Sequence, residues 1–261
     1  MHRTTIALII GVATAAWLAV PGNGTLAQGS AITALATNAI TGPLLALAES
    51  HKRQTGTQVT VEFDTSPSIL RRLAAGEGSG VDVLVTSTVG VDQAIKDGKA
   101  IAATRAMLGK VGVGVAVRRG ARVPDISSVD ALKASILNAD AVVYSQGASG
   151  VYVEKLLQNL GVAAQVKGKA VQVTTGDAML EHLSESRGNE VGFTQVSEIK
   201  RAESKGHVTL VGLLPASVQN YTVFEAVVMA GSRAPAAARA FVTALTSPAG
   251  RKELAANAWE F

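Results

Sequence analysis

The amino-acid sequence predicts an α/β fold of two lobes, each a mostly parallel sheet flanked by helices. Short Val-rich runs alternate along the chain with segments of helical periodicity, a rhythm typical of strand–helix–strand units. The Val-rich runs are apolar on both faces, as in strands that are covered by helices on both sides. Two longer β-like segments, near residues 109–117 and 208–229, interrupt the rhythm and are expected to cross between the lobes.

The expected elements follow from these patterns in chain order. Val-rich runs predict strands over residues 31–36, 59–63, 81–85, 111–117, 141–144, 190–193, 208–211 and 223–229. Helical periodicity predicts helices over residues 44–54, 68–75, 128–138, 151–159, 178–184, 235–245 and 248–257. With two crossing strands, residues 28–112 and 224–261 form a discontinuous first lobe, and residues 113–223 form the second.

The first 27 residues are typical of a secretory signal peptide. A short positive region, Met1 to Arg3, precedes an apolar run over 6–20, and Thr25 and Ala27 place small residues before a cleavage point. The run is short for a membrane span of ~20 apolar residues, although a retained N-terminal anchor is the alternative. The sequence therefore predicts export to the periplasm, with cleavage near Ala27.

Composition argues against several classes of protein. The net charge of +4 falls to about +3 once Arg3 is removed, and the basic residues are scattered with few aromatic neighbours, so nucleic-acid binding is not expected. The absence of cysteine excludes disulfides and thiolate chemistry. No histidine pair has the spacing of a metal site, and neither a metal nor another cofactor is expected.

Small polar residues gather at the carboxyl ends of the predicted strands. In doubly wound sheets, ligands lie off these ends, where the next helices begin. The candidate ligand-binding residues are Thr37, Asn38, Thr65, Ser66, Ser68, Ser87, Thr88, Ala148, Ser149, Gly150, Gly176, Asp177 and Gln195. Each alone is explained as a helix N-cap, but helix beginnings that converge on one cleft offer free N–H groups and partial positive charge to an anion.

Arg71 is a further candidate, because it follows the turn at Ser66 and Ser68 by about one helical turn and could reach a carboxylate with two hydrogen bonds. The alternative is an arginine that faces solvent.

The order of motifs resembles that of the periplasmic molybdate-binding proteins and their relatives, which are type II periplasmic binding proteins of ABC importers. The resemblance covers residues 31–261. It is carried by Thr37-Asn38, TGTQV at 55–59, SPSIL at 66–70, GVDVLVTS at 80–87, GASGVY from Gly147 to Tyr152, EVGF at 190–193 and AFVTALTSP at 240–248.

The resemblance implies two lobes that close around a ligand in the cleft between them. Family contacts map onto Thr37 or Asn38, Ser66 or Ser68, Ser87, the Ala148-Ser149 turn and the Gly176-Asp177 turn. Tyr152, in the same motif as Ser149, is a further candidate ligand-binding residue. Two features depart from the family: its Ala-Ser-Ser start is Thr37-Asn38-Ala39, and its oxyanion-binding tyrosine is replaced within residues 192–195, where Gln195 offers an amide. These departures leave a larger organic anion open beside a molybdate-like oxyanion.

The resemblance therefore implies a binding protein that delivers a small anion to a membrane ABC permease, and we expect a monomer. The alternative is an enzyme on the same scaffold, since some proteins similar to this family isomerise unsaturated tricarboxylates such as aconitate. That reaction needs a base, for which Asp64 and Asp177 are the candidates, with Arg71 as a carboxylate clamp.

Overall fold

The computed structural model describes residues 31–261. The signal peptide predicted for residues 1–27 lies outside the described residues. Within the described part of the chain, no helix is both long enough and apolar enough to cross a membrane.

Strands and helices alternate over most of this range. The strands are β1 (Ala31–Thr37), β2 (Gln58–Asp64), β3 (Val83–Ser87), β4 (Ala106–Arg118), β5 (Val142–Ser145), β6 (Ala170–Val173), β7 (Val191–Gln195), β8 (Val208–Leu213) and β9 (Tyr221–Val228). The α-helices are α1 (Thr41–Thr55), α2 (Ser66–Ala74), α3 (Thr88–Lys96), α4 (Val129–Asn138), α5 (Ala148–Asn159), α6 (Ala163–Val166), α7 (Gly176–Glu185), α8 (Val196–Ser204), α9 (Pro235–Thr246) and α10 (Pro248–Ala256). A 3-10 turn, η1 (Asn38–Ile40), leads from β1 into α1.

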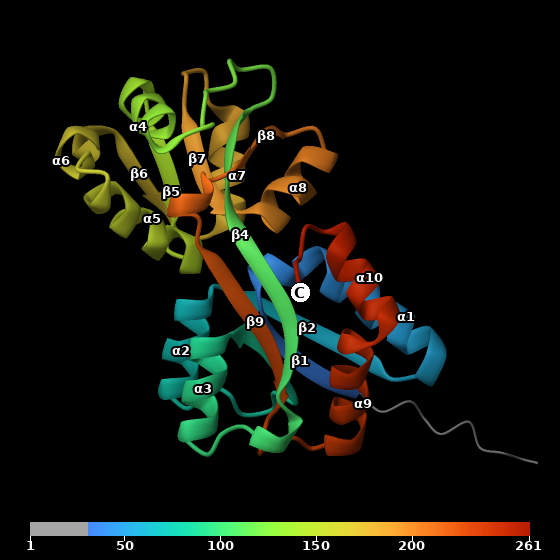
Figure 1. The fold of residues 1–261 in the computed structure, drawn as a ribbon. Helices are drawn as coiled ribbons and strands as arrows, with labels where there is room; N and C mark the ends of the chain where they lie inside the picture. The colour runs from blue at the N-terminus through green and yellow to red at the C-terminus, as the bar shows by residue number, and fades with distance from the viewer. Residues whose placement is uncertain (1–30) are drawn as a thin grey trace, which may run out of the picture.

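Two lobes are joined by the long strands β4 and β9, which confirms the predicted architecture (Figure 1). In one lobe β1 pairs in parallel with β2 and β3, and in the other β5 pairs in parallel with β6 and β7. Strand β4 is antiparallel to β9 as far as Gly112, and from Val113 it is antiparallel to β7. The predicted boundaries of the lobes, at 112/113 and 223/224, stay predictions.

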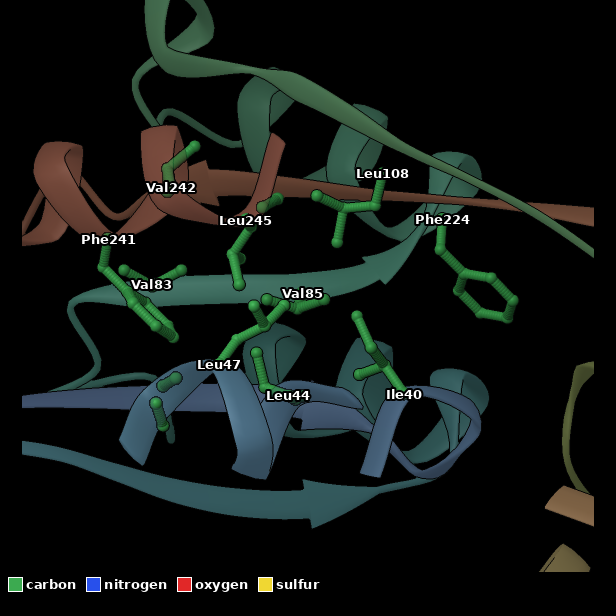
Figure 2. Packing of buried hydrophobic residues seen from close by; sticks show 14 of the residues in the cluster. Ile40, Leu44, Leu47, Val83, Val85, Leu108, Phe224, Phe241, Val242 and Leu245 are labelled. Atoms are coloured by element: carbon green, nitrogen blue, oxygen red, sulfur yellow. The ribbon is translucent and has the colours of Figure 1, made fainter. Parts of the chain in front are cut away.

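Helices cover both faces of each sheet, as the apolar strands predict. In the first lobe α1, α9 and α10 lie on one face and α2 and α3 on the other (Figure 1). Figure 2 shows Leu44 and Leu47 of α1 facing Phe241 and Leu245 of α9, with Val83 of β3 between them. Phe241 and Leu245 are fully buried, and burial of each stabilises the fold by roughly 1.5–3 kcal/mol.

Three α-helices, α3, α8 and the single-turn α6, and the strand β6 were not predicted from the sequence. The first turn of α3 contains Val89, Gly90 and Val91, which are weak helix formers. The buried face of α8 includes Ser197 and Glu198 as well as apolar residues, so its apolar periodicity is weak. Packing against the sheets overrides these local preferences in α3 and α8.

The chain topology brings the carboxyl ends of the parallel strands of both lobes toward the crossing strands. β1 and β2 end at Thr37 and Asp64, and β5, β6 and β7 end at Ser145, Val173 and Gln195. Each of these ends is followed within three residues by the start of a helix. The two lobes therefore face one another with strand ends and helix beginnings.

Candidate functional site

A small cavity lies between the two lobes. It is lined by Thr37, Asn38, Ala39, Thr65, Ser66 and Phe224 from the first lobe and by Ser145, Gly147, Ala148, Ser149, Gly176, Gln195 and Glu198 from the second. Its volume is ≈ 20 Å³. That is enough for about one water molecule, so a larger ligand would enter only if the lobes moved apart.

Helix beginnings supply much of the lining. Thr37, Thr65, Gly147 and Gln195 are the N-cap residues of η1, α2, α5 and α8, and Gly176 is the first residue of α7. The first N–H groups of a helix have no partner within it and lie at the positive end of its dipole. Among the described residues that line the cavity there is no Lys, Arg or His. Any attraction for an anion therefore comes from neutral donors.

In the first lobe, two hydroxyl residues meet across the ends of neighbouring strands. The Ser66 hydroxyl donates to Thr37 Oγ1 at 3.3 Å, and both side chains are buried. Thr65 Oγ1 accepts from the backbone N–H of Ser68 at 3.3 Å and caps α2. The Thr65 side chain is thus engaged by its own helix, whereas Thr37 and Ser66 form a hydroxyl pair at the cavity wall.

In the second lobe, α5 begins in close contact with the end of β5. The N–H of Gly147 donates to Ser145 Oγ at 3.1 Å. A Cβ on Gly150 would lie 1.5 Å from the carbonyl oxygen of Ser145, so a glycine is needed for the helix to start there. This approach places the Ser149 hydroxyl at the cavity, 3.5 Å from Thr194 Oγ1.

Glu198 is the single ionisable side chain among the described residues that line the cavity. It is 5% exposed, and the Thr194 hydroxyl donates to its Oε2 at 2.6 Å. A Cβ on Gly176 would lie 2.5 Å from the same oxygen, so the carboxyl fits against α7 because residue 176 is glycine.

Burial raises the pKa of Glu198 to about 7. The hydrogen bond from Thr194 lowers the pKa, the carboxylate of Asp177 raises it, and the guanidinium of Arg201 lowers it. Because desolvation disfavours the charged form, Glu198 holds its proton at a pH where an exposed glutamate has lost it.

Behind the cavity, two contacts join the lobes. The Ser197 hydroxyl donates to the carbonyl oxygen of Ala39 at 2.8 Å, which ties the first turn of α8 to η1. The amide of Gln195 donates to the carbonyl of Val111 in β4 at 3.1 Å and accepts from the Thr222 hydroxyl of β9 at 3.0 Å, in the orientation that satisfies both ends. Gln195 therefore connects the cavity to both crossing strands.

Comparison with known proteins identifies the family. The family described as "Bacterial extracellular solute-binding protein" matches residues 32–260. The chain belongs to this family. It is 30% identical over 232 residues to an aconitate isomerase from a Pseudomonas species, with 85% of each chain covered.

Solved structures of other solute-binding proteins share its fold. The periplasmic molybdate-binding protein of Azotobacter vinelandii has a TM-score of 0.75 at 16% identity, covering 88% of this chain and 99% of that one. The substrate-binding domain of a putative molybdenum ABC transporter from Clostridium difficile has a TM-score of 0.67 at 16% identity, covering 89% and 99%. At this identity the likeness shows the fold alone, and it confirms the type II architecture that the motifs predict.

In this solute-binding protein, about half of the predicted binding residues line one cavity. They come from five of the six turns that the sequence singled out, all except the turn at Ser87 and Thr88. The residues that the structure brings together are Thr37, Asn38, Thr65, Ser66, Ala148, Ser149, Gly176 and Gln195.

The other predicted residues lie outside this lining, and their contacts with a ligand stay predictions. They are Ser68, Arg71, Ser87, Thr88, Gly150, Tyr152 and Asp177.

For four of these residues, a hydrogen bond, a helix N-cap role or exposure to solvent accounts for the place of the residue outside the cavity. The side chain of Arg71 is exposed, and Ser87 is the N-cap residue of α3. Thr88 Oγ1 donates to the carbonyl of Val223 at 3.5 Å. The Tyr152 hydroxyl donates to the carbonyl of Val218 at 2.7 Å.

The two carboxylates considered as bases are engaged outside the cavity lining. Asp64 accepts from the Ser68 hydroxyl at 2.7 Å and lies 3.8 Å from the guanidinium of Arg72. Asp177 forms an ion pair with Arg201 and is exposed. Neither carboxylate is among the residues that line the cavity, and a role for either as a base stays a prediction.

Sequence reasoning missed five lining residues: Ala39, Ser145, Gly147, Glu198 and Phe224. Ser145 and Gly147 belong to the turn that follows β5, from which the sequence analysis selected Ala148 and Ser149 as binding residues. Glu198 gave no separate signal, because an acidic residue in the first turn of a helix is ordinary. Thr194 lies in β7 and Glu198 in the first turn of α8, so their contact crosses the boundary between the strand and the helix.

Proposed function

We propose that this solute-binding protein is exported to the periplasm, where it captures a small organic carboxylate in the interlobe cavity for a membrane ABC permease. One observation carries the proposal. Helix beginnings and hydroxyl groups from both lobes line a single small cavity, so a ligand there would contact both lobes. Type II binding proteins use such contacts to close around their solutes.

The chemistry of the lining supports an anion as the ligand. Free N–H groups at helix beginnings and the hydroxyls of Thr37, Ser66 and Ser149 are donors to negatively charged oxygen.

The comparisons favour a carboxylate over an oxyanion of molybdate type. The relative at 30% identity is named for aconitate, a tricarboxylate, whereas the molybdate-binding protein shares 16% of its residues. The sequence also has Phe193, which is buried, within the segment where molybdate-binding relatives carry the oxyanion-binding tyrosine.

A thermal-shift panel tests this proposal. It contains molybdate, tungstate, sulfate, phosphate and a series of di- and tricarboxylates. At a ligand concentration about 100 times Kd, binding adds about 2.7 kcal/mol to the unfolding free energy. For a chain of this length we expect a rise in Tm of roughly 5–10 °C with a carboxylate. If no carboxylate in the panel raises the Tm, the proposal is wrong.

The variant Ser149→Ala tests whether the carboxylate binds in the interlobe cavity. Loss of its hydroxyl should weaken carboxylate binding by about tenfold or more, because a hydrogen bond to a charged group contributes roughly 1.5–3 kcal/mol. Ser204→Ala is the matched control, since that serine is exposed on α8 and bonds to the carbonyl of Arg201. Equal affinities of both variants would place the ligand elsewhere.

An isomerase of an unsaturated tricarboxylate is the second candidate, and the likeness to an aconitate isomerase favours it. In this reaction a base removes a proton from one carbon, the double bond shifts, and a proton is added at the other end of the three-carbon unit. A base beside the cavity is required for this transfer. Glu198 lines the cavity, and Asp64 and Asp177 do not.

Proton NMR of cis- and trans-aconitate with the purified protein separates the two functions. Stoichiometric binding without conversion would exclude the isomerase. Conversion that is lost in Glu198→Gln but kept in Asp64→Asn and Asp177→Asn would support it and would identify the base.

A further inference from the structure

We propose that Glu198 is a ligand-binding residue that carries a proton, so that capture of a carboxylate anion takes up a proton at the cavity. The inference rests on the proposed anion binding and adds to it the protonation state of the site. It begins from an apparent conflict. The cavity offers donors to an anion, yet the one ionisable side chain in its described lining is an acid.

The geometry of Glu198 resolves the conflict if its carboxyl is neutral. The Thr194 hydroxyl donates to Oε2 at 2.6 Å, and the backbone N–H of Gln195 also donates to the carboxyl. A carboxyl group has about four lone-pair sites, so a site remains for the acid proton. A neutral carboxyl is itself a donor through its O–H group. In this form Glu198 joins Ser149 and the helix N–H groups as a donor to the ligand, and the electrostatic repulsion between two carboxylates disappears.

The charged groups around Glu198 favour the neutral form only in part. From α7, the carboxylate of Asp177 favours it, and from α8 itself the guanidinium of Arg201 opposes it. These two groups form an ion pair with one another, which weakens the effect of each. β7 contributes the neutral side chains of Thr194 and Gln195, and η1, tied to α8 through Ala39, contributes no charged side chain. Burial therefore remains the main influence on the proton.

Binding of an anion strengthens this preference. A negative charge placed beside the carboxyl favours the protonated form, so the pKa of Glu198 rises above its ligand-free value of about 7. At pH 8 about nine-tenths of the free protein is ionised at Glu198. Each binding event at that pH then takes up close to one proton, and the affinity falls about fivefold between pH 7 and pH 8.

Calorimetric titration with tricarballylate tests the inference. This saturated tricarboxylate has no double bond that the protein could shift, and its carboxyls, with an ordinary pKa of about 4, are ionised in the chosen range. Titrations at pH 7 and pH 8 in phosphate and in Tris report the number of protons taken up. For the wild type we expect Kd to rise about fivefold between the two values and uptake of about 0.9 proton at pH 8.

Two variants test whether the proton that is taken up on binding belongs to Glu198. Glu198→Gln keeps a donor of similar shape and should bind with one affinity at pH 7 and pH 8, without proton uptake. Glu181→Gln removes an equal charge from an exposed position on α7 and should behave as the wild type does. A variant Glu198→Gln that still takes up a proton would overturn the inference, because the proton would then belong to another group.

The remaining outcomes are also distinct. If the wild type binds tricarballylate without proton uptake, the inference fails while the proposed function stands. If no carboxylate binds at any pH, the proposed function fails and the inference with it. Carbon NMR of the ligand-free protein provides a further measurement: a carboxyl of Glu198 that titrates near pH 4.5 would also overturn the inference.

Discussion

Replacement of Glu198 by glutamine should change the pH dependence of stability in the ligand-free protein. Burial holds the pKa of Glu198 at about 7 in the folded state, whereas the ordinary value of 4.5 applies to the unfolded chain. Between these two values the unfolded state releases a proton that the folded state retains. The unfolding free energy therefore decreases as the pH rises through this window.

The difference of about 2.5 pH units corresponds to about 3 kcal/mol at 1.36 kcal/mol per unit. The contribution is complete below pH 4.5 and is lost by the time the pH has passed 7. Because Glu198 is 5% exposed, solvent screening reduces this value little. Glutamine has no proton to lose, so Glu198→Gln lacks this part of the pH dependence.

Urea denaturation of both proteins at pH 5, 6, 7 and 8 measures the effect. The difference in unfolding free energy between Glu198→Gln and the wild type should increase by roughly 2–3 kcal/mol over this range, in favour of the variant. Buried His51, whose pKa is lowered by burial, acts in the opposite direction but equally in both proteins. A difference that stays constant across the range, as expected for the control Glu181→Gln, would refute the reasoning.

Two further variants test local geometry. Tyr152→Phe removes the hydroxyl that donates to the carbonyl of Val218. We expect urea denaturation to show an unfolding free energy lower by about 1 kcal/mol, with carboxylate affinity unchanged. A large loss of affinity would instead make Tyr152 a ligand contact. Gly150→Ala places a Cβ 1.5 Å from the carbonyl oxygen of Ser145, so we expect the unfolding free energy to fall by about 3 kcal/mol or more. A Tm within about 2 °C of the wild type would contradict the observed start of α5.

The fold could be predicted from the sequence because its main signals are local. Val-rich strands that are covered on both faces, and helices between them, follow from the period of apolar residues. The prediction failed at α3 and α8, where tertiary packing stabilises segments that are poor helix formers or weakly amphipathic. In α3, Val91 and Ala94 are buried beneath the helix, which the residues around them do not reveal.

The site was predictable only in part, for a different reason. The rule that ligands lie at the carboxyl ends of strands identifies the turns, and it led correctly to Thr37, Ser66 and Ser149 as neighbours of one cavity. It does not say which side chain of a turn points inward. Ser68 lies two residues from Ser66 but turns back to Asp64, since the first turn of α2 rotates it away from the cavity.

The burial of Glu198 depends on contacts between segments that lie far apart in the sequence. Its burial requires Gly176 on α7, the hydroxyl of Thr194 on β7, and a first turn of α8 that is joined to the other lobe through Ser197 and Ala39. Since burial is the largest cause of its raised pKa, any separation of the lobes that admits water to the carboxyl would lower that pKa toward 4.5. The proton is therefore retained most strongly when the lobes are together, which is also the state in which the donors of both lobes can meet a shared anion.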